Sequence, residues 1–262
     1  MGIVNVTPDS FSDGGEWFVF DEAVEHARVL VAEGAHILDI GGESTRPGAA
    51  PVPVDEELRR VIPVVRAVRD SGAQISVDTM KLTVAAAAVE AGATYVNDVT
   101  AFRHEPDLAG FVADRGCDCC LMHMLGEPRT MQHDPRYEDV VDDVRAFLEQ
   151  RVEFAVGEGV REERIMVDPG IGFGKTLDHN LELLRRLDEI VAVGFPVVIG
   201  TSRKSFLGRL TGREDPHDRV AATLATTVLA LERGASVFRV HDVAPTRDAL
   251  AVATATLRRD GA

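Results

Sequence analysis

Cysteine and long apolar stretches are scarce in this sequence, and each scarcity excludes a class of protein. No segment approaches the roughly 18 consecutive apolar residues of a membrane span, and the first residues show neither the cationic flank nor the apolar run of a signal peptide. We therefore expect a cytoplasmic protein with no membrane partner. Cys117, Cys119 and Cys120 lie in one apolar run whose spacings fit neither a zinc site nor a disulfide framework, so we expect reduced thiols in the core.

Positive charge is also in short supply. The formal net charge is −15 and the isoelectric point is about 4.9, whereas binding to nucleic acid without sequence preference needs a basic surface that displaces counterions. No nucleic-acid partner is expected. Lysine occurs only as Lys81, Lys175 and Lys204.

Alternating strand and helix patterns are what the sequence has in quantity. Short apolar runs predict strands at 2–6, from 36, 74–78, 94–98, 117–123, 164–168, 196–200 and 236–241. Apolar residues at helical spacing predict helices from 21, from about 55, and at 81–91, 106–115, 137–157, 177–193, about 216–233 and from about 245. We expect polar loops at 7–20 and 201–216, a solvated face on the charged helix 137–157, and a kink or broken turn at Pro63.

This strict alternation predicts the fold class. Crossover helices between successive strands require parallel strands, and the 262 residues with 45% hydrophobic content match the length of about 250 residues usual for a closed barrel. The prediction is an α/β protein with one domain over residues 1–262, a single (β/α)8 TIM barrel whose site lies at the C-terminal ends of the strands.

Polar residues stand at the end of every predicted strand. They are Asn5, Asp39 with Glu43, Asp78, Asn97 with Asp98, His123, Asp168, Ser202 with Arg203 and Lys204, and Arg239 with His241. A single aspartate in such a place is more often a helix cap, an asparagine can close a turn, and a histidine in an apolar run is more often a satisfied core residue. Because all strands of such a barrel end at one mouth, we expect the whole set to converge there.

Two groups within this set suggest what the mouth binds. The donors and acceptors suited to the amide and amino edges of a flat heterocycle are Asp78, Asn97, Asp168 and Lys204. The cationic side chains suited to a phosphate or carboxylate are Arg46, Arg203, Arg239 and His241. The residues therefore predict a planar ring that carries an anionic tail.

The segment DPGIGFGKT, residues 168–176, resembles a phosphate-binding loop but has Pro169 where that loop needs its first glycine. Its glycines are expected to let the backbone approach a flat ligand, with Phe173 as a wall. No set of Ser, His and Asp or of Cys and His stands out as a nucleophile, so we expect chemistry without a covalent intermediate.

Eight motifs, in order along nearly the whole chain, carry a family resemblance. They are NVTPDSFSDGG from residue 5, DIGGESTRPG from 39, SVDT from 76, VNDV from 96, LMHM from 121, DPGIGFGK from 168, SRKSFLG from 202 and RVHDV from 239. The set resembles the dihydropteroate synthases, the sulfonamide targets of folate biosynthesis. The resemblance implies a transferase that condenses (7,8-dihydropterin-6-yl)methyl diphosphate with 4-aminobenzoate, with Mg²⁺ as cofactor, to give 7,8-dihydropteroate and pyrophosphate.

The resemblance also implies roles for single residues. The pterin would be held by Asp78, Asn97, Asp168 and Lys204, packed by Met122 and Phe173, and covered by Arg239. Asn5 would ligate Mg²⁺ with the diphosphate, while the phosphates would be contacted by Thr45, Arg239 and His241. The aminobenzoate would be surrounded by Phe11, Pro47 and Ser202, with Asp13 and Arg46 locking the first two βα loops and Arg203 in the same binding set. The catalytic residues would be Asp78, Asp168, Lys204, Arg46 and Asp13.

The implied chemistry is a dissociative displacement, in which the diphosphate leaves before the arylamine attacks. The family and the apolar final helices suggest a homodimer. Family chains usually carry a short segment before the Met-Gly-Ile pattern that opens this sequence, and we expect its absence to affect stability more than chemistry. Two alternatives stay open: a pterin-binding paralogue without turnover, and a methyltetrahydrofolate-binding barrel of a corrinoid methyltransferase, which would need neither the STRPG nor the SRK loop.

Overall fold

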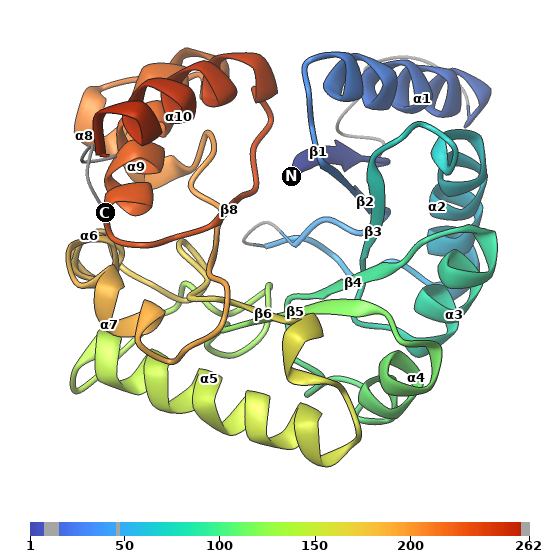
Figure 1. Cartoon of the computed structure of the whole chain (residues 1–262), viewed down its shortest axis with the longest axis horizontal. Coiled ribbons are helices and arrows are strands. Elements are labelled where there is room, and N and C mark those ends of the chain that lie inside the picture. The colour runs from blue at the N-terminus through green and yellow to red at the C-terminus, as the bar shows by residue number, and fades with distance from the viewer. Residues whose placement is uncertain (8–15, 46–47, 258–262) are drawn as a thin grey trace.

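The computed structural model describes residues 1–7, 16–45 and 48–257, which form a ring of parallel strands surrounded by helices (Figure 1). The strands are β1 (Gly2–Asn5), β2 (Ile37–Gly41), β3 (Gln74–Asp78), β4 (Tyr95–Asp98), β5 (Asp118–Met122), β6 (Ile165–Asp168), β7 (Val198–Ile199) and β8 (Val237–Phe238). Strands β1 to β6 pair in sequence order, and β7 pairs with β8. Bridges from Gly2 to Val240 and from Val167 to Val197 join the two sheets on both sides. The barrel is therefore closed, which confirms the predicted fold class.

The helices occupy the outside of this ring (Figure 1). They are α1 (Glu16–Ala32), α2 (Val54–Val68), α3 (Leu82–Ala91), α4 (Asp107–Arg115), α5 (Val140–Gly157), α6 (Leu177–Arg185), α7 (Leu187–Val191), α8 (Ser205–Thr211), α9 (Val220–Glu232) and α10 (Val243–Leu257), with 3-10 turns η2 (Glu162–Arg164) and η3 (Pro216–Arg219). Helix α1 begins at Glu16 instead of near Asp21, because the run from Glu16 to Phe20 contains no glycine or proline to stop a helix.

Helix α8 lies where the sequence predicted a loop. Its side chains of Phe206 and Leu207 are buried in the core. The helix ends at Gly212, whose φ of 70° is a left-handed conformation that glycine adopts at low cost. Seven residues are too few for helical periodicity to stand out in a sequence, so burial of the two apolar side chains decided the structure here.

The sequence predicted a kink or a broken first turn at Pro63, and the turn is not broken, because α2 runs from Val54 to Val68 with Pro63 inside it. Pro63 and Arg59 are both exposed. Pro63 has no N–H group to donate to the carbonyl of Arg59. This carbonyl lies on the outer face of the helix, where it can accept a hydrogen bond from water. The helix continues through the proline with one hydrogen bond fewer.

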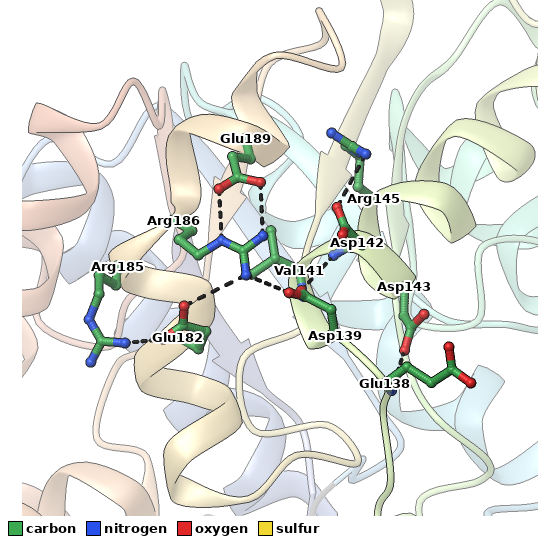
Figure 2. Close-up of polar contacts among 10 residues, drawn as sticks. All are labelled: Glu138, Asp139, Val141, Asp142, Asp143, Arg145, Glu182, Arg185, Arg186 and Glu189. Carbon is green, nitrogen blue, oxygen red and sulfur yellow. Dashed lines mark hydrogen bonds and ion pairs between the residues drawn. The ribbon is translucent and has the colours of Figure 1, made fainter.

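The single helix predicted at 177–193 is divided at Arg186, whose φ of −108° and ψ of 31° leave the helical region. Its guanidinium is the centre of an ionic cluster (Figure 2). Arg186 lies 2.7 Å from Asp139 Oδ2 and 2.7 Å from Glu189 Oε1. Asp139 also caps α5, because its carboxylate accepts the N–H of Val141 at 2.9 Å. The cluster thus ties the start of α5 to the junction of α6 and α7.

Helix α5 is amphipathic and not simply a solvated face. It buries Val141, Val144 and Leu148 among others, while Asp142, Asp143 and Glu149 are exposed. The three cysteines are buried and free, as the sequence predicted. Among the described residues, no helix is long and apolar enough to cross a membrane.

Candidate active site

A polar layer crosses the barrel between two apolar clusters. The lower cluster, nearer the N-terminal ends of the strands, contains Ile37, Tyr95, Cys120 and Val198. The upper cluster, at and beyond their C-terminal ends, contains Val99, Met122, Met124 and Met131, with Phe173 packed against it. Since side chains alternate along a strand, the residue two positions after a lower-cluster residue also points into the barrel. That rule places Asp39, Asn97 and Met122 in the interior, towards the C-terminal ends of the strands.

Asp39 is the centre of this polar layer. Its carboxylate is fully buried and accepts hydrogen bonds from Ser76 Oγ at 2.6 Å, Asn97 Nδ2 at 3.0 Å and Arg239 Nε at 2.6 Å. Arg239 Nη2 also donates to Asp78 Oδ2 at 2.7 Å. One guanidinium therefore bridges two carboxylates. Asp39 was placed at the mouth by the sequence but without a role, and the structure gives it one: it holds Asn97 and Arg239.

This arrangement changes the proton affinity of Asp78. Burial raises the pKa of Asp78 to about 7, an effect that the charge of Arg239 opposes and the charge of Asp39 reinforces. Burial lowers the pKa of Arg239, but the charges of Asp39 and Asp78 more than offset it, so that this pKa lies above its ordinary value. Near neutral pH, Asp78 can hold or release a proton while Arg239 stays charged.

Asp168 and Lys204 form a second polar group. The carboxylate of Asp168 accepts the backbone N–H of Gly170 at 2.7 Å; burial raises the pKa of Asp168, and the charge of Lys204 opposes this. Lys204 Nζ donates to the carbonyl of Ile171 and lies 4.6 Å from the centre of the Phe173 ring. Burial lowers the pKa of Lys204 to about 8, and Asp168 opposes that shift. The pair places an acceptor and a cationic donor beside a flat aromatic wall.

The glycines of the turn after β6 are required by close approaches within the protein. Gly170 has a φ of 66°, and a Cβ there would lie 1.9 Å from the carbonyl oxygen of His123. At Gly174, also with φ of 66°, a Cβ would lie 2.7 Å from Leu125 Cβ. The structure therefore explains these glycines by packing against the segment after β5, whereas the sequence had suggested an approach to a ligand.

His123 does not face the mouth, which corrects the expectation from the sequence. Lys175 Nζ lies 2.8 Å from His123 Nδ1, and the imidazole packs edge-on against Phe147 of α5 with 4.8 Å between ring centres. Burial and the neighbouring lysine lower the pKa of His123 to about 2, and burial lowers the pKa of Lys175 well below its ordinary value. His123 is a neutral core histidine. Strand alternation could have found this, because His123 follows the inward residue Met122 by one position.

Asp98 turns away from the mouth for the same reason of alternation, because it follows the inward Asn97. Its carboxylate accepts the N–H groups of Thr100 at 2.7 Å and Phe102 at 2.8 Å, so it caps the local turn. Burial raises the pKa of Asp98, and those hydrogen bonds oppose the shift.

Arg203 forms a two-point ion pair with Asp242, at 3.0 Å and 2.6 Å. Its charge is therefore balanced within the protein, and it offers less to an anionic ligand than the sequence suggested. Ser202 and His241, which follow β7 and β8, lie together. Ser202 Oγ is 2.9 Å from the ring nitrogen Nδ1 of His241, and the backbone N–H of His241 donates to Ser202 Oγ at 3.1 Å.

The remaining predicted residues divide into two groups. Thr45 follows β2 and Asn5 ends β1, and both are half-buried. The others lie outside the described residues, and they are Phe11, Asp13, Arg46 and Pro47.

Asn5 is the residue that the sequence resemblance assigns to Mg²⁺. Within residues 1–7, 16–45 and 48–257, no group of three or more His, Cys, Asp or Glu side chains could hold a metal ion. Mg²⁺ commonly keeps several waters and takes one or two protein oxygens together with substrate phosphates. One half-buried amide oxygen from Asn5 fits an ion that arrives with a diphosphate, and it does not fit an ion held by the protein alone.

Comparisons with known proteins bear on this site. Residues 1–241 match the family model described as pterin binding enzyme. The dihydropteroate synthase of Escherichia coli is 46% identical over 258 residues, which are 98% of this chain and 91% of that protein. A probable bifunctional folylpolyglutamate synthase/dihydropteroate synthase of Haloferax volcanii is 48% identical over 256 residues, which are 98% of this chain and 30% of that protein.

The solved structures agree with the sequence relatives. Dihydropteroate synthase of Xanthomonas albilineans with 4-aminobenzoic acid matches with a TM-score of 0.93 at 50% identity, over 99% of this chain and 93% of that one. The same enzyme in complex with 7,8-dihydropteroate matches with a TM-score of 0.90 at 48% identity, again over 99% and 93%. This chain therefore belongs to the dihydropteroate synthases, transferases of folate biosynthesis within the family of pterin-binding enzymes.

Proposed function

We propose that this synthase condenses (7,8-dihydropterin-6-yl)methyl diphosphate with 4-aminobenzoate, giving 7,8-dihydropteroate and pyrophosphate. The observation that carries the proposal is the linkage between the residues assigned to the pterin ring. Asp78 pairs in register with Asn97, and both are connected through Arg239 and Asp39. Their side chains are therefore fixed before a ligand arrives, which lowers the cost of binding a rigid ring.

Each group of the layer suits one part of a pterin. A carboxylate accepts two adjacent N–H groups, as the amino and ring nitrogens of a pterin present them, and Asp168 is assigned this role with Asp78. Lys204 supplies a donor for the ring carbonyl side, and Asn97 can both donate and accept. Phe173 and Met122 pack against the ring, and the planar guanidinium of Arg239 lies over it.

The reaction proposed is a dissociative displacement. The bond between the exocyclic carbon and the diphosphate oxygen breaks, and its electron pair leaves with the diphosphate. The carbon becomes a cation conjugated with the electron-rich dihydropterin, and the charges of ionised Asp78 and Asp168 lower its energy. The amine nitrogen of 4-aminobenzoate then attacks this carbon with its lone pair, and the resulting ammonium gives up a proton to solvent water. Because the pKa of Asp78 is about 7, the approach of positive charge favours its ionised form when it is needed.

The departing diphosphate is assigned to Thr45, Arg239 and His241. Arg239 has this role from the sequence resemblance; its two carboxylate partners fix the orientation of its guanidinium and also balance its charge. Asn5 would hold Mg²⁺ with the diphosphate, and the ion would supply neutralisation of the charge that develops on the leaving group. The aminobenzoate is assigned to Phe11, Pro47 and Ser202, with Asp13 and Arg46 locking the loops, on the strength of the sequence resemblance.

Pyrophosphate release tests the proposal directly. The protein is incubated with the pterin diphosphate and Mg²⁺, with and without 4-aminobenzoate, and the organic product is identified. Dihydropteroate that forms only with both substrates is the expected result. Tight binding of the pterin without any product would contradict the proposal and favour a paralogue without turnover.

The protein is further proposed to be a homodimer through α9 and α10, in a reducing compartment such as the cytoplasm. A groove between these helices has an apolar lining that includes Leu224, Val228, Val252 and Leu257, and Val252 is 69% exposed. Clustered exposed apolar side chains mark interfaces. Three free thiols support the compartment. Light scattering that finds one 28.3 kDa chain at micromolar concentration would contradict the dimer.

A further inference from the structure

Lys81 has no part in the pterin site, yet its side chain is almost completely buried, with 7% of the residue exposed. Its ammonium donates to Glu43 Oε2 at 2.5 Å, to Glu57 Oε2 at 2.6 Å and to the carbonyl oxygen of Val52 at 2.6 Å. Glu57 accepts a further hydrogen bond from Thr79 Oγ1 at 2.7 Å. An ammonium has three N–H donors, so all of them are used.

The three acceptors of Lys81 belong to two different elements. Glu43 and Val52 lie in the connection between β2 and α2, and we call its described residues 43–45 and 48–52 loop 43–52. Glu57 lies on α2. Lys81 therefore fastens both described stretches of loop 43–52 to a helix.

The stem of loop 43–52 is fixed by packing as well. The carbonyl of Gly42, just before the loop, accepts from Arg60 Nη1 at 2.9 Å. A Cβ at Gly42 would lie 2.8 Å from Val61 Cγ2, so the backbone lies directly against α2. Further along, the N–H of Gly48 donates to the carbonyl of Pro128 at 3.2 Å.

The attachment of loop 43–52 to α2 depends on the charge of the Lys81 ammonium. Burial lowers the pKa of Lys81, but the hydrogen bonds that its ammonium donates to Glu43 and Glu57 more than offset this, so the pKa lies above its ordinary value and the ammonium stays charged at neutral pH. Two buried carboxylates share this single charge. Apolar side chains could fill the same space without desolvating ions. The ion cluster instead fixes the positions of Glu43 and Val52 relative to α2, because both must reach the same ammonium.

We propose that Lys81 is a positioning residue for the synthase reaction, and that with Glu43 and Glu57 it holds loop 43–52 where Thr45 reaches the diphosphate end of the pterin substrate. The identity of that ligand rests on the proposed function. Thr45 follows Glu43 by two residues, so a change at Glu43 is transmitted over a short path. The pterin ring is assigned to other residues, and the effect should therefore spare ring binding.

Glu43→Gln is the informative variant, since it weakens the hold on the loop and leaves the pair of Lys81 with Glu57 intact. The expected result is a rise of about tenfold in KM for the pterin diphosphate, since a hydrogen bond to a charged group contributes on this scale. The dissociation constant of a pterin without the diphosphate should stay at the parent value. The matched control is Asp118→Asn, which removes a carboxylate from its 2.9 Å ion pair with Arg164 at the opposite end of the barrel and should leave kinetics unchanged.

Two outcomes would overturn the proposal: parent KM values in Glu43→Gln, or an equal rise of KM in Glu43→Gln and Asp118→Asn, which would indicate general loosening. If Glu43→Gln does not fold, as judged by circular dichroism, Glu43→Asp keeps the charge and shortens the reach by one methylene. A smaller rise in KM is then expected, and parent values would again refute the role of Lys81. Failure of the synthase assignment is distinguishable, because the parent protein itself would then release no pyrophosphate.

Discussion

Replacing Asp78 by asparagine should make the protein more stable at neutral pH and nearly inactive. Burial raises the pKa of Asp78 from 3.8 to about 7. The native state therefore binds this proton more tightly than the unfolded state, and the contribution of Asp78 to stability is fully present below about pH 4 and is lost as the pH rises towards 7. A shift of this size corresponds to a loss on the order of 4 kcal/mol.

The Asp78→Asn variant isolates this effect because it changes little else. An amide oxygen can still accept the hydrogen bond from Arg239 Nη2, and the remaining charges of Asp39 and Arg239 balance each other. Contributions of all other titrating groups cancel when variant and parent are compared at the same pH. The free energy of unfolding of the variant minus that of the parent should therefore increase by on the order of 4 kcal/mol between about pH 4 and pH 7.

Urea unfolding at a series of pH values measures this difference, and pyrophosphate release measures the activity. The rate should fall about 10²- to 10³-fold, since a preorganised charge next to the developing cation is lost. A stability difference that does not change with pH would refute the account of Asp78 as a carboxyl with a raised pKa. A variant with nearly the parent rate would refute its role in the reaction.

Three further predictions concern single side chains. Lys204→Ala should lower kcat about 10²- to 10³-fold, and a near-normal rate would remove Lys204 from the site. Asn5→Ala should weaken the effect of Mg²⁺ on binding of the pterin diphosphate, measured by calorimetry, and should not change binding of a pterin without the diphosphate; an unchanged response to Mg²⁺ would contradict the ligand role. Arg186→Ala should lower the melting temperature, less so at high salt, and leave kinetics unchanged, because it breaks the cluster of Figure 2 outside the barrel. Melting at the parent temperature would mean that the cluster does not contribute to stability.

Local patterns predicted much of the fold. Strand β3 has the bounds that the sequence predicted, because Ile75 and Val77 alternate with the polar residues Gln74, Ser76 and Asp78. The prediction was wrong where a short or exposed feature decided the outcome. Helix α8 was missed because seven residues carry little periodicity, and α2 continues through Pro63 because the proline is on the solvent side.

The sequence by itself determined that this chain forms a closed barrel of alternating strands and helices, because element order and apolar spacing are local properties. The motifs also determined the family, since they occur in order over nearly the whole chain.

Only the tertiary structure decided which polar side chain faces which. Arg239 contacts Asp39 because closure of the barrel brings β8 next to β1 and within reach of β2. His123 faces α5 because it lies on the outer side of β5. Lys81 joins loop 43–52 to α2, which precedes it in the sequence. These pairs are 24 to 200 residues apart in sequence. Their formation depends on the closure of the barrel and on which elements pack against each other, which no local pattern contains.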